Sequence, residues 1–281
     1  MKKISSLLIF TLSVYLSCHS QTLRRPVAAN YIGLGAYSTS HTDVFSFIAN
    51  QASLARMNSL SAGVYGEKRF MLNELSLYNL AIALPTKSGN FGIKGSHYGF
   101  NEYNESQAGL AYARNLGSKI DIGVQFDYNT IKVAGYGNAS AINFEAGAIL
   151  HLSDKLNAGI HLSNPAGGKY SKGENEKLPF VYTAGLGYEA SGNFFVSAEL
   201  EKEEDQPVNV NAGLQYKFLP QLITRAGLSS ATSTVWMGIG VGIRSIRIDA
   251  AASYHPHLGI TPGLMLVFNF KSNDSKEEQA D

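Results

Sequence analysis

The chain has little cysteine, little excess charge of either sign and no long apolar run beyond its N-terminus. Its single cysteine, Cys18, lies in the N-terminal segment that is expected to be cleaved off as a signal peptide. The processed chain then has no cysteine, which excludes a disulfide framework and a thiolate metal site. The net charge is +1, and no segment gathers the lysines and arginines that nucleic-acid binding needs. No later stretch approaches the length of a transmembrane helix. These absences argue against a disulfide scaffold, a nucleic-acid binder and a helical membrane protein.

Apolar and polar residues instead alternate from about Leu60 to Phe270. Ile120 to Asn129 and Val208 to Lys217 are two such stretches, with an apolar side chain at every second position. A period of two residues indicates β-strands. A soluble sandwich alternates too, but it buries its apolar faces and rarely carries so many charges on the other face. We therefore predict an all-β fold, an antiparallel transmembrane β-barrel that turns apolar side chains to lipid and polar ones to its lumen.

Turn residues divide this region into about fourteen strands, an even number as in bacterial barrels of this kind. The last strand ends with Phe268 and Phe270 on one face, which resembles the aromatic final strand that barrel-assembly machinery recognises. The expected barrel is residues 60–271, followed by a disordered polar tail at 272–281. The expected strands are 60–68, 74–85, 89–99, 105–115, 118–132, 139–152, 155–163, 179–190, 193–203, 207–218, 221–229, 234–243, 245–255 and 261–271.

Residues 1–20 have the pattern of a secretory signal peptide. Two lysines precede an apolar stretch that is too short to span a membrane, and small residues precede Gln21. Lipoprotein processing at Cys18 is the alternative, although Tyr15 stands where a lipobox normally has leucine. A barrel behind a signal peptide predicts the outer membrane of a Gram-negative bacterium.

Residues 21–59 lack the two-residue period. Thr42 and Asp43 are expected to cap a short helix that runs to Met57. A wall of fourteen strands encloses more space than its own side chains fill, so we expect this segment to plug the lumen. A lead-in helix outside the barrel is the alternative. Glycines on the polar side of many strands fit a wall that packs against something inside.

Two groups of residues are candidates for a functional site in the lumen. The first is expected to line or close it and consists of Phe45, Phe47, Ile48, Asn50, Leu54 and Trp236. The second consists of charges expected to form ion pairs there, namely Asp127, Glu145, Glu199, Arg225, Arg247 and Asp249.

The sequence motifs that could indicate metal binding or catalysis are weak. His255 and His257 have a spacing that a metal could use, but the intervening proline indicates a turn and no carboxylate or cysteine is close in sequence. His97 is expected to face lipid or the rim without an evident serine partner on its face, as lipase chemistry would need. We therefore expect no enzyme activity, no metal and no cofactor.

Several motifs resemble those of FadL-type barrels and of the PorV/PorQ-like barrels of the Bacteroidetes. They are Tyr31–Tyr37, Thr42–Phe45, Asn50–Ala55, Ser163–Gly168, Ala198–Asp205 with Pro207–Asn209, and Ser253–Gly259. Two departures are that Gln51 replaces the proline usual in the family motif and that the chain is shorter than typical FadL channels. The resemblance implies either passage of hydrophobic small molecules or a role beside the type IX secretion machinery.

Three functions are therefore open, of which we favour the first. They are a channel for hydrophobic small molecules, an accessory barrel that docks a secretion-system protein, and a plugged structural barrel. The expected partners are membrane lipid and either such a small molecule or such a protein, and not nucleic acid. The longest interruption between strands, residues 164–179, is expected at the cell surface and is the docking loop under the second hypothesis.

Overall fold

The structure is a computed structural model that describes residue 34 and residues 37–171, 178–204 and 206–270. The expected signal peptide, most of residues 21–36, the tip of the 164–179 loop and the polar tail lie outside these residues.

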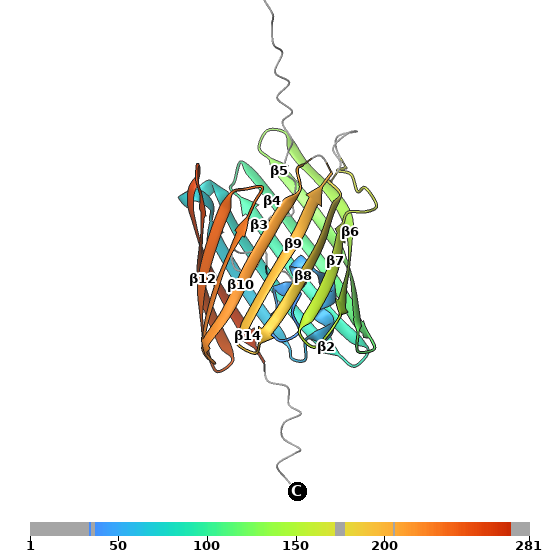
Figure 1. Cartoon of the computed structure of the whole chain (residues 1–281). Coiled ribbons are helices and arrows are strands. Elements are labelled where there is room, and N and C mark those ends of the chain that lie inside the picture. Colours follow the sequence, from blue (N-terminus) through green and yellow to red (C-terminus); the bar gives the residue numbers. More distant parts are fainter. Residues whose placement is uncertain (1–33, 35–36, 172–177, 205, 271–281) are drawn as a thin grey trace, which may run out of the picture.

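The described residues form one closed barrel of fourteen antiparallel strands, as the sequence predicts (Figure 1). Consecutive strands are neighbours, and β1 closes the barrel by pairing with β14 from Ser61↔Asn269 to Glu67↔Gly263. Closure leaves no free sheet edge, so the wall satisfies its backbone groups internally. The strands are β1 (Ser61–Lys68), β2 (Ser76–Thr86), β3 (Gly89–Gly99), β4 (Tyr103–Leu116), β5 (Ile120–Val133), β6 (Gly137–His151), β7 (Leu156–Ser163), β8 (Val181–Ser191), β9 (Phe194–Glu203), β10 (Asn209–Leu219), β11 (Leu222–Ser229), β12 (Thr234–Ile243), β13 (Ile246–His255) and β14 (Gly259–Asn269).

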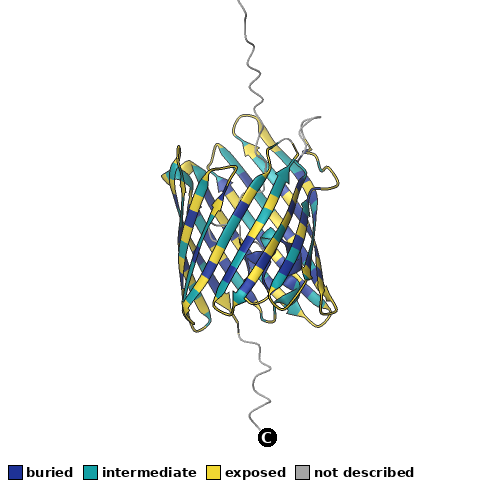
Figure 2. Cartoon of the chain, viewed as in Figure 1, coloured by how far each residue is buried: buried dark blue, intermediate teal, exposed yellow. Residues whose placement is uncertain are grey.

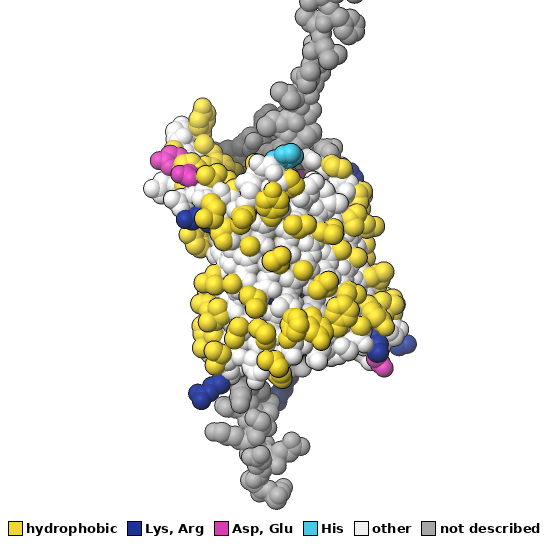
Figure 3. All heavy atoms as spheres, turned by 60° about the vertical axis from the view of Figure 1, so that its left-hand side comes forward, with side chains coloured by type: hydrophobic (Ala, Val, Ile, Leu, Met, Phe, Trp, Pro, Cys, Tyr) yellow, Lys and Arg dark blue, Asp and Glu magenta, His cyan; other side chains and the backbone are white. Residues whose placement is uncertain are grey.

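Side chains alternate between the outer surface and the lumen in the phase that the sequence predicts. Exposed and buried positions alternate along the strands (Figure 2). Val124 is 36% exposed on the outside, whereas its neighbour Gln125 is fully buried inside. Leu214 and Gln215 show the same contrast. On the face shown in Figure 3, apolar side chains spread over the height of the wall and charged ones gather near its two ends. An apolar outside around a polar inside reverses the arrangement of a soluble protein and suits a lipid bilayer.

The two ends of the barrel differ in their connections. We call the end where β1 begins and β14 ends the terminal rim, and the other end the opposite rim. The longest connection, residues 164–180 between β7 and β8, lies at the opposite rim. Its described parts fold onto β6, where Ser171 N donates to Ser140 O at 2.8 Å and where Tyr170 and Leu178 are buried. The base of this connection is therefore part of the wall.

The helical elements are α2 (Ser46–Ala49), η1 (Gln51–Arg56), η2 (Arg69–Met71) and η3 (Asn73–Leu75), the last three being 3₁₀ turns. None of the helices in the described residues is long and apolar enough to cross a membrane.

The single helix expected across residues 42–57 is wrong. It is broken at Asn50, whose backbone is extended with φ −153° and ψ 116° between α2 and η1. The side chain of Asn50 explains the break, because its Oδ1 accepts from Ala52 N at 3.1 Å while its Nδ2 donates to Ile160 O in the wall at 3.0 Å. The N-cap of α2 is Phe45 and not Asp43, whose Oδ1 accepts from Phe45 N at 2.9 Å in the turn before the helix. Contacts with the wall, rather than helix propensity, determine the shape of this segment.

Candidate functional site

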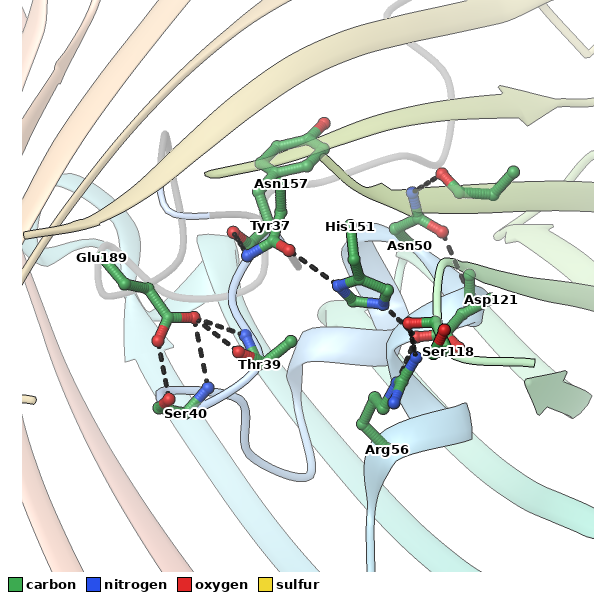
Figure 4. A network of polar contacts seen from close by, with 12 residues as sticks. Tyr37, Thr39, Ser40, Asn50, Arg56, Ser118, Asp121, His151, Asn157 and Glu189 are labelled. Atoms are coloured by element: carbon green, nitrogen blue, oxygen red, sulfur yellow. Dashed lines mark hydrogen bonds and ion pairs between the residues drawn. The ribbon is translucent and has the colours of Figure 1, made fainter. Parts of the chain in front are cut away.

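Residues 37–59, which we call the inner segment, lie inside the barrel in the half of the lumen next to the terminal rim (Figures 1 and 4). Arg56 Nη2 donates to Ser118 O in the β4–β5 turn at 3.1 Å. The amide of Asn90 donates to Leu54 O at 2.5 Å and to Met57 O at 2.8 Å. These bonds join the end of the segment to two hairpins of the terminal rim.

One face of the inner segment is apolar and packs against an apolar part of the lumenal wall. Phe45, Phe47 and Leu54 are fully buried there. Two wall glycines provide the space, because a Cβ on Gly63 would lie 2.5 Å from the Phe45 ring and one on Gly92 would lie 2.8 Å from Leu54 Cδ1. The wall residues of this cluster are Tyr65, Ala81, Ala83, Ala111, Ala113, Met265 and Val267.

The first polar anchor of the segment is the carboxylate of Glu189 on β8. Its Oε1 accepts from Ser38 Oγ at 2.8 Å, Thr39 N at 2.6 Å and Thr39 Oγ1 at 2.9 Å. Its Oε2 accepts from Ser40 Oγ at 2.6 Å. Three consecutive residues thus wrap around one carboxylate, and Figure 4 shows two of them, Thr39 and Ser40.

The second anchor is Asp121 on β5. Its Oδ2 accepts from Arg56 Nε at 2.8 Å and lies 2.7 Å from His151 Nε2. The other ring nitrogen of His151 lies 2.7 Å from Asn157 Oδ1, and Asn157 Nδ2 donates to Tyr37 O at 3.3 Å. This network connects both ends of the inner segment through the wall (Figure 4).

The third anchor is a chain of charges on β10 to β13. Arg247 donates to Asp43 of the inner segment and, through Nε, to Asp249 Oδ2 at 2.7 Å. Asp249 Oδ1 accepts from Arg225 Nη1 at 3.0 Å, and Arg225 Nε donates to Gln215 Oε1 at 2.7 Å. Breaking a buried pair of this kind is costly, because the remaining charge has no compensation.

A fourth group lies on β3 to β7. Gln51 Nε2 donates to Glu145 Oε2 at 2.6 Å, and His161 Nε2 lies 3.0 Å from the same oxygen. Lys94 Nζ is 3.2 Å from Asp127 Oδ1 and 3.7 Å from Glu145 Oε1. Gln51, which departs from the family motif, therefore makes one of the contacts that hold the segment.

The structure places the first candidate group in two places. Phe45, Phe47, Ile48, Asn50 and Leu54 lie together on the inner segment. Trp236 belongs to a separate apolar cluster with Leu34, Phe195 and Ala251.

The six candidate charges all face the lumen, where they lie in three separate groups. Asp127 and Glu145 meet at Lys94, and Arg225, Arg247 and Asp249 form the chain described above. Glu199 Oε2 accepts from Tyr37 Oη and its Oε1 from Asn211 Nδ2, both at 3.0 Å. Glu189, Asp121 and Lys94 were not among the predicted site residues, although each lies on the polar phase of its strand.

His41, a residue of the inner segment, packs against the wall. Its ring stacks on Phe195 with centroids 5.5 Å apart. Burial, helped by the nearby charge of Lys217 and opposed by Glu189, lowers the pKa of His41 to about 4. The ring is therefore neutral near pH 7.

The remaining histidine motifs show no catalytic or metal-binding arrangement. His97 was expected to lack a serine partner, which is wrong: its Nδ1 lies 2.9 Å from Ser106 Oγ across β3 and β4 on the outer face. Both residues are inside paired strands, whose backbone N–H groups are not free to bind an oxyanion. His255 Nδ1 accepts from the backbone N–H of His257 and Leu258 at 3.1 and 3.2 Å, so it stabilises a turn.

Comparison with protein-family models finds no match, and neither does comparison with curated proteins. Among solved structures, the toluene transporter TodX of P. putida matches with a TM-score of 0.59 and 13% identity, covering 85% of this chain and 99% of TodX. A Pseudomonas aeruginosa FadL homologue matches with a TM-score of 0.55 and 12% identity, covering 85% of this chain and 94% of its own. At this identity the likeness shows the fold alone, an outer-membrane β-barrel like those of TodX and the FadL homologue, and the resemblance to PorV/PorQ-like barrels stays a prediction.

Proposed function

We propose that this protein is an outer-membrane channel for small hydrophobic molecules, in which the inner segment is the barrier that must move. The apolar outer surface and closed wall support the membrane location. TodX, described as a toluene transporter and a monoaromatic hydrocarbon channel, has the same fold.

The observation that carries the proposal is the apolar part of the lumenal wall. A barrel lumen is ordinarily polar, yet Ala81, Ala83, Ala111 and Ala113 present small apolar side chains to it, all buried under the inner segment. Displacement of the segment would expose this apolar surface. A hydrocarbon could then pack against it in the place of Phe45 and its neighbours. Polar anchors around this surface hold the segment in place without filling the apolar part themselves.

A second candidate is an accessory barrel that docks a secretion-system protein. It is favoured by the number of anchors, since the segment is tied to β5, β8 and β13 by charged groups. A segment that never leaves would make the barrel a closed scaffold.

A reversible cross-link separates the two. Ala52 on η1 and Ile149 on β6 touch inside the barrel, so a disulfide between Ala52→Cys and Ile149→Cys would fix the segment to the wall. The native Cys18 lies in the expected signal peptide, so it would not compete in the processed protein.

We expect proteoliposomes with the double variant to take up toluene when reduced and to lose uptake when oxidised. Ala52→Cys alone is the control and should transport in both conditions. Equal uptake in both states would refute the role of the segment as the barrier. If the uncross-linked wild type takes up no toluene, the channel proposal fails and the closed accessory barrel is favoured.

A further inference from the structure

The half of the lumen next to the opposite rim contains a second, polar feature. A cavity of ≈ 50 Å³ extends from Ile48 of the inner segment to the ends of β3, β4 and β8, where Tyr98, Glu105 and Val181 line it. One buried water needs on the order of 10–15 Å³, so this space admits several polar groups at once. The cavity is separate from the apolar wall that Phe45 and Leu54 cover.

Four neutral polar side chains form a continuous row across this cavity. Asn79 on β2 is directly opposite Ser96 on β3, which is opposite Gln107 on β4, which is opposite Asn129 on β5. All four line the cavity. Neighbouring strands are about 4.8 Å apart, so the row is roughly 15 Å wide. Its amides and hydroxyl offer both donors and acceptors.

Two members of the row have buried polar atoms with no hydrogen-bond partner among the described residues. They are Asn79 Nδ2, on a residue 7% exposed, and Asn129 Oδ1, on a residue 1% exposed. Asn129 uses its Nδ2 on Asn143 Oδ1 at 2.8 Å, which leaves its oxygen for the cavity. A buried donor and a buried acceptor left unpaired destabilise the barrel unless something binds them.

The charges around the cavity select against anions. Lys94, a cation on its wall, is already within 3.2 Å of Asp127 and 3.7 Å of Glu145. Glu105 and Glu145 add negative charge to the lining. A hydrocarbon would leave the polar row without partners, which costs free energy. Because the row itself is uncharged and offers both donors and acceptors, a neutral molecule with several hydroxyl groups matches it.

We infer that this cavity binds a neutral, hydroxyl-rich molecule of saccharide type, with one hydroxyl paired to Asn79 Nδ2 at one end of the row and a distant hydroxyl paired to Asn129 Oδ1 at the other end. The enclosed volume admits one edge of a sugar ring, and the rest of the molecule lies across the polar row, between β2 and β5. This site does not depend on the hydrocarbon path, because it lies on the other side of Ile48 from the apolar wall.

The test is saturation-transfer NMR on the full-length barrel in detergent, with glucose and maltose as neutral probes, gluconate as an anionic probe and toluene as an apolar competitor. Asn79→Leu and Asn129→Leu keep the side-chain size and remove the polar atoms. His97→Leu is the matched control, since it follows Ser96 on β3 but faces outward. Heat-modifiability on gels checks that each variant is folded.

We expect millimolar binding of maltose to wild type and His97→Leu, and about tenfold weaker binding to each asparagine variant, as for the loss of one hydrogen bond. Asn79→Leu is the variant least able to affect folding, because its Nδ2 has no protein partner to lose among the described residues. The proposal is overturned if neither sugar binds the folded wild type, which would mean that the cavity holds water only. It is also overturned if folded Asn79→Leu and Asn129→Leu bind maltose as wild type does, if gluconate binds as well as glucose, or if toluene displaces maltose.

Discussion

Replacement of Glu189 tests how firmly the inner segment is held. The carboxylate accepts four bonds of 2.6–2.9 Å from Ser38, Thr39 and Ser40. Hydrogen bonds to a charged group contribute roughly 1.5–3 kcal/mol each, but the released residues regain water and conformational freedom. We therefore expect Glu189→Leu to weaken docking of residues 37–41 by roughly 4 kcal/mol, and Glu189→Gln, which keeps one acceptor oxygen, by roughly 1–2 kcal/mol.

The assay is hydrogen exchange of the Thr39 amide, which donates directly to Glu189. Local opening controls its exchange, and each 1.4 kcal/mol is about a factor of ten. Exchange should accelerate about a thousandfold in Glu189→Leu and about tenfold in Glu189→Gln. Glu74→Gln, which removes an exposed carboxylate at the opposite rim, should leave it unchanged. If the folded Glu189→Leu barrel exchanges this amide as slowly as wild type, the anchor has no energetic role and the reasoning is refuted.

Three further changes test the wall and the segment. Val124→Arg should lower stability by roughly 2–4 kcal/mol in urea unfolding from lipid vesicles, because Val124 faces the lipid. Tyr136→Arg, in the exposed β5–β6 turn, should lower it by only roughly 0–1 kcal/mol, and equal effects would contradict the lipid-facing position of Val124. Gly123→Ala places a Cβ 2.5 Å from the backbone of η1 and should displace the segment, seen as faster proteolysis, whereas Gly192→Ala meets open space and should not. Because burial lowers the pKa of His41 to about 4, docking should be strongest above pH 6.5 and weaken as pH falls toward 4. A His41→Phe variant with the same pH dependence of exchange would contradict this.

The strands could be predicted closely because each wall residue has only two environments. Lipid and lumen alternate with the two-residue pleat, so the span expected at 234–243 coincides with β12 and that at 89–99 with β3. The same pattern correctly predicted that Val124 faces outward and that Gln125 and Trp236 face the lumen.

The pairing of lumenal charges could not be predicted, because it depends on how the closed strands are staggered. Lys94 on β3 and Asp127 on β5 are not on neighbouring strands, because Gly109 on β4 lies opposite both of them. Only the register of the three strands brings Lys94 Nζ to 3.2 Å from Asp127 Oδ1. The break at Asn50 was equally hidden. It depends on Ile160 O, a wall carbonyl 110 residues away in sequence.

The glycines nevertheless encode the position of the inner segment in the wall itself. A Cβ would lie 2.5 Å from the Gln51 backbone if placed on Gly123, and 2.6 Å from the Tyr37 ring if placed on Gly159. The wall of the polar cavity, in contrast, carries Asn, Ser and Gln at the equivalent inward positions. Glycines at inward positions such as Gly123 and Gly159 thus mark where the segment comes closest to the wall, whereas inward amides occur in both halves, since Asn90 and Asn157 bind the segment. A run of inward glycine and alanine in neighbouring strands therefore predicts close packing of an inner segment, because only small side chains leave room for its backbone there.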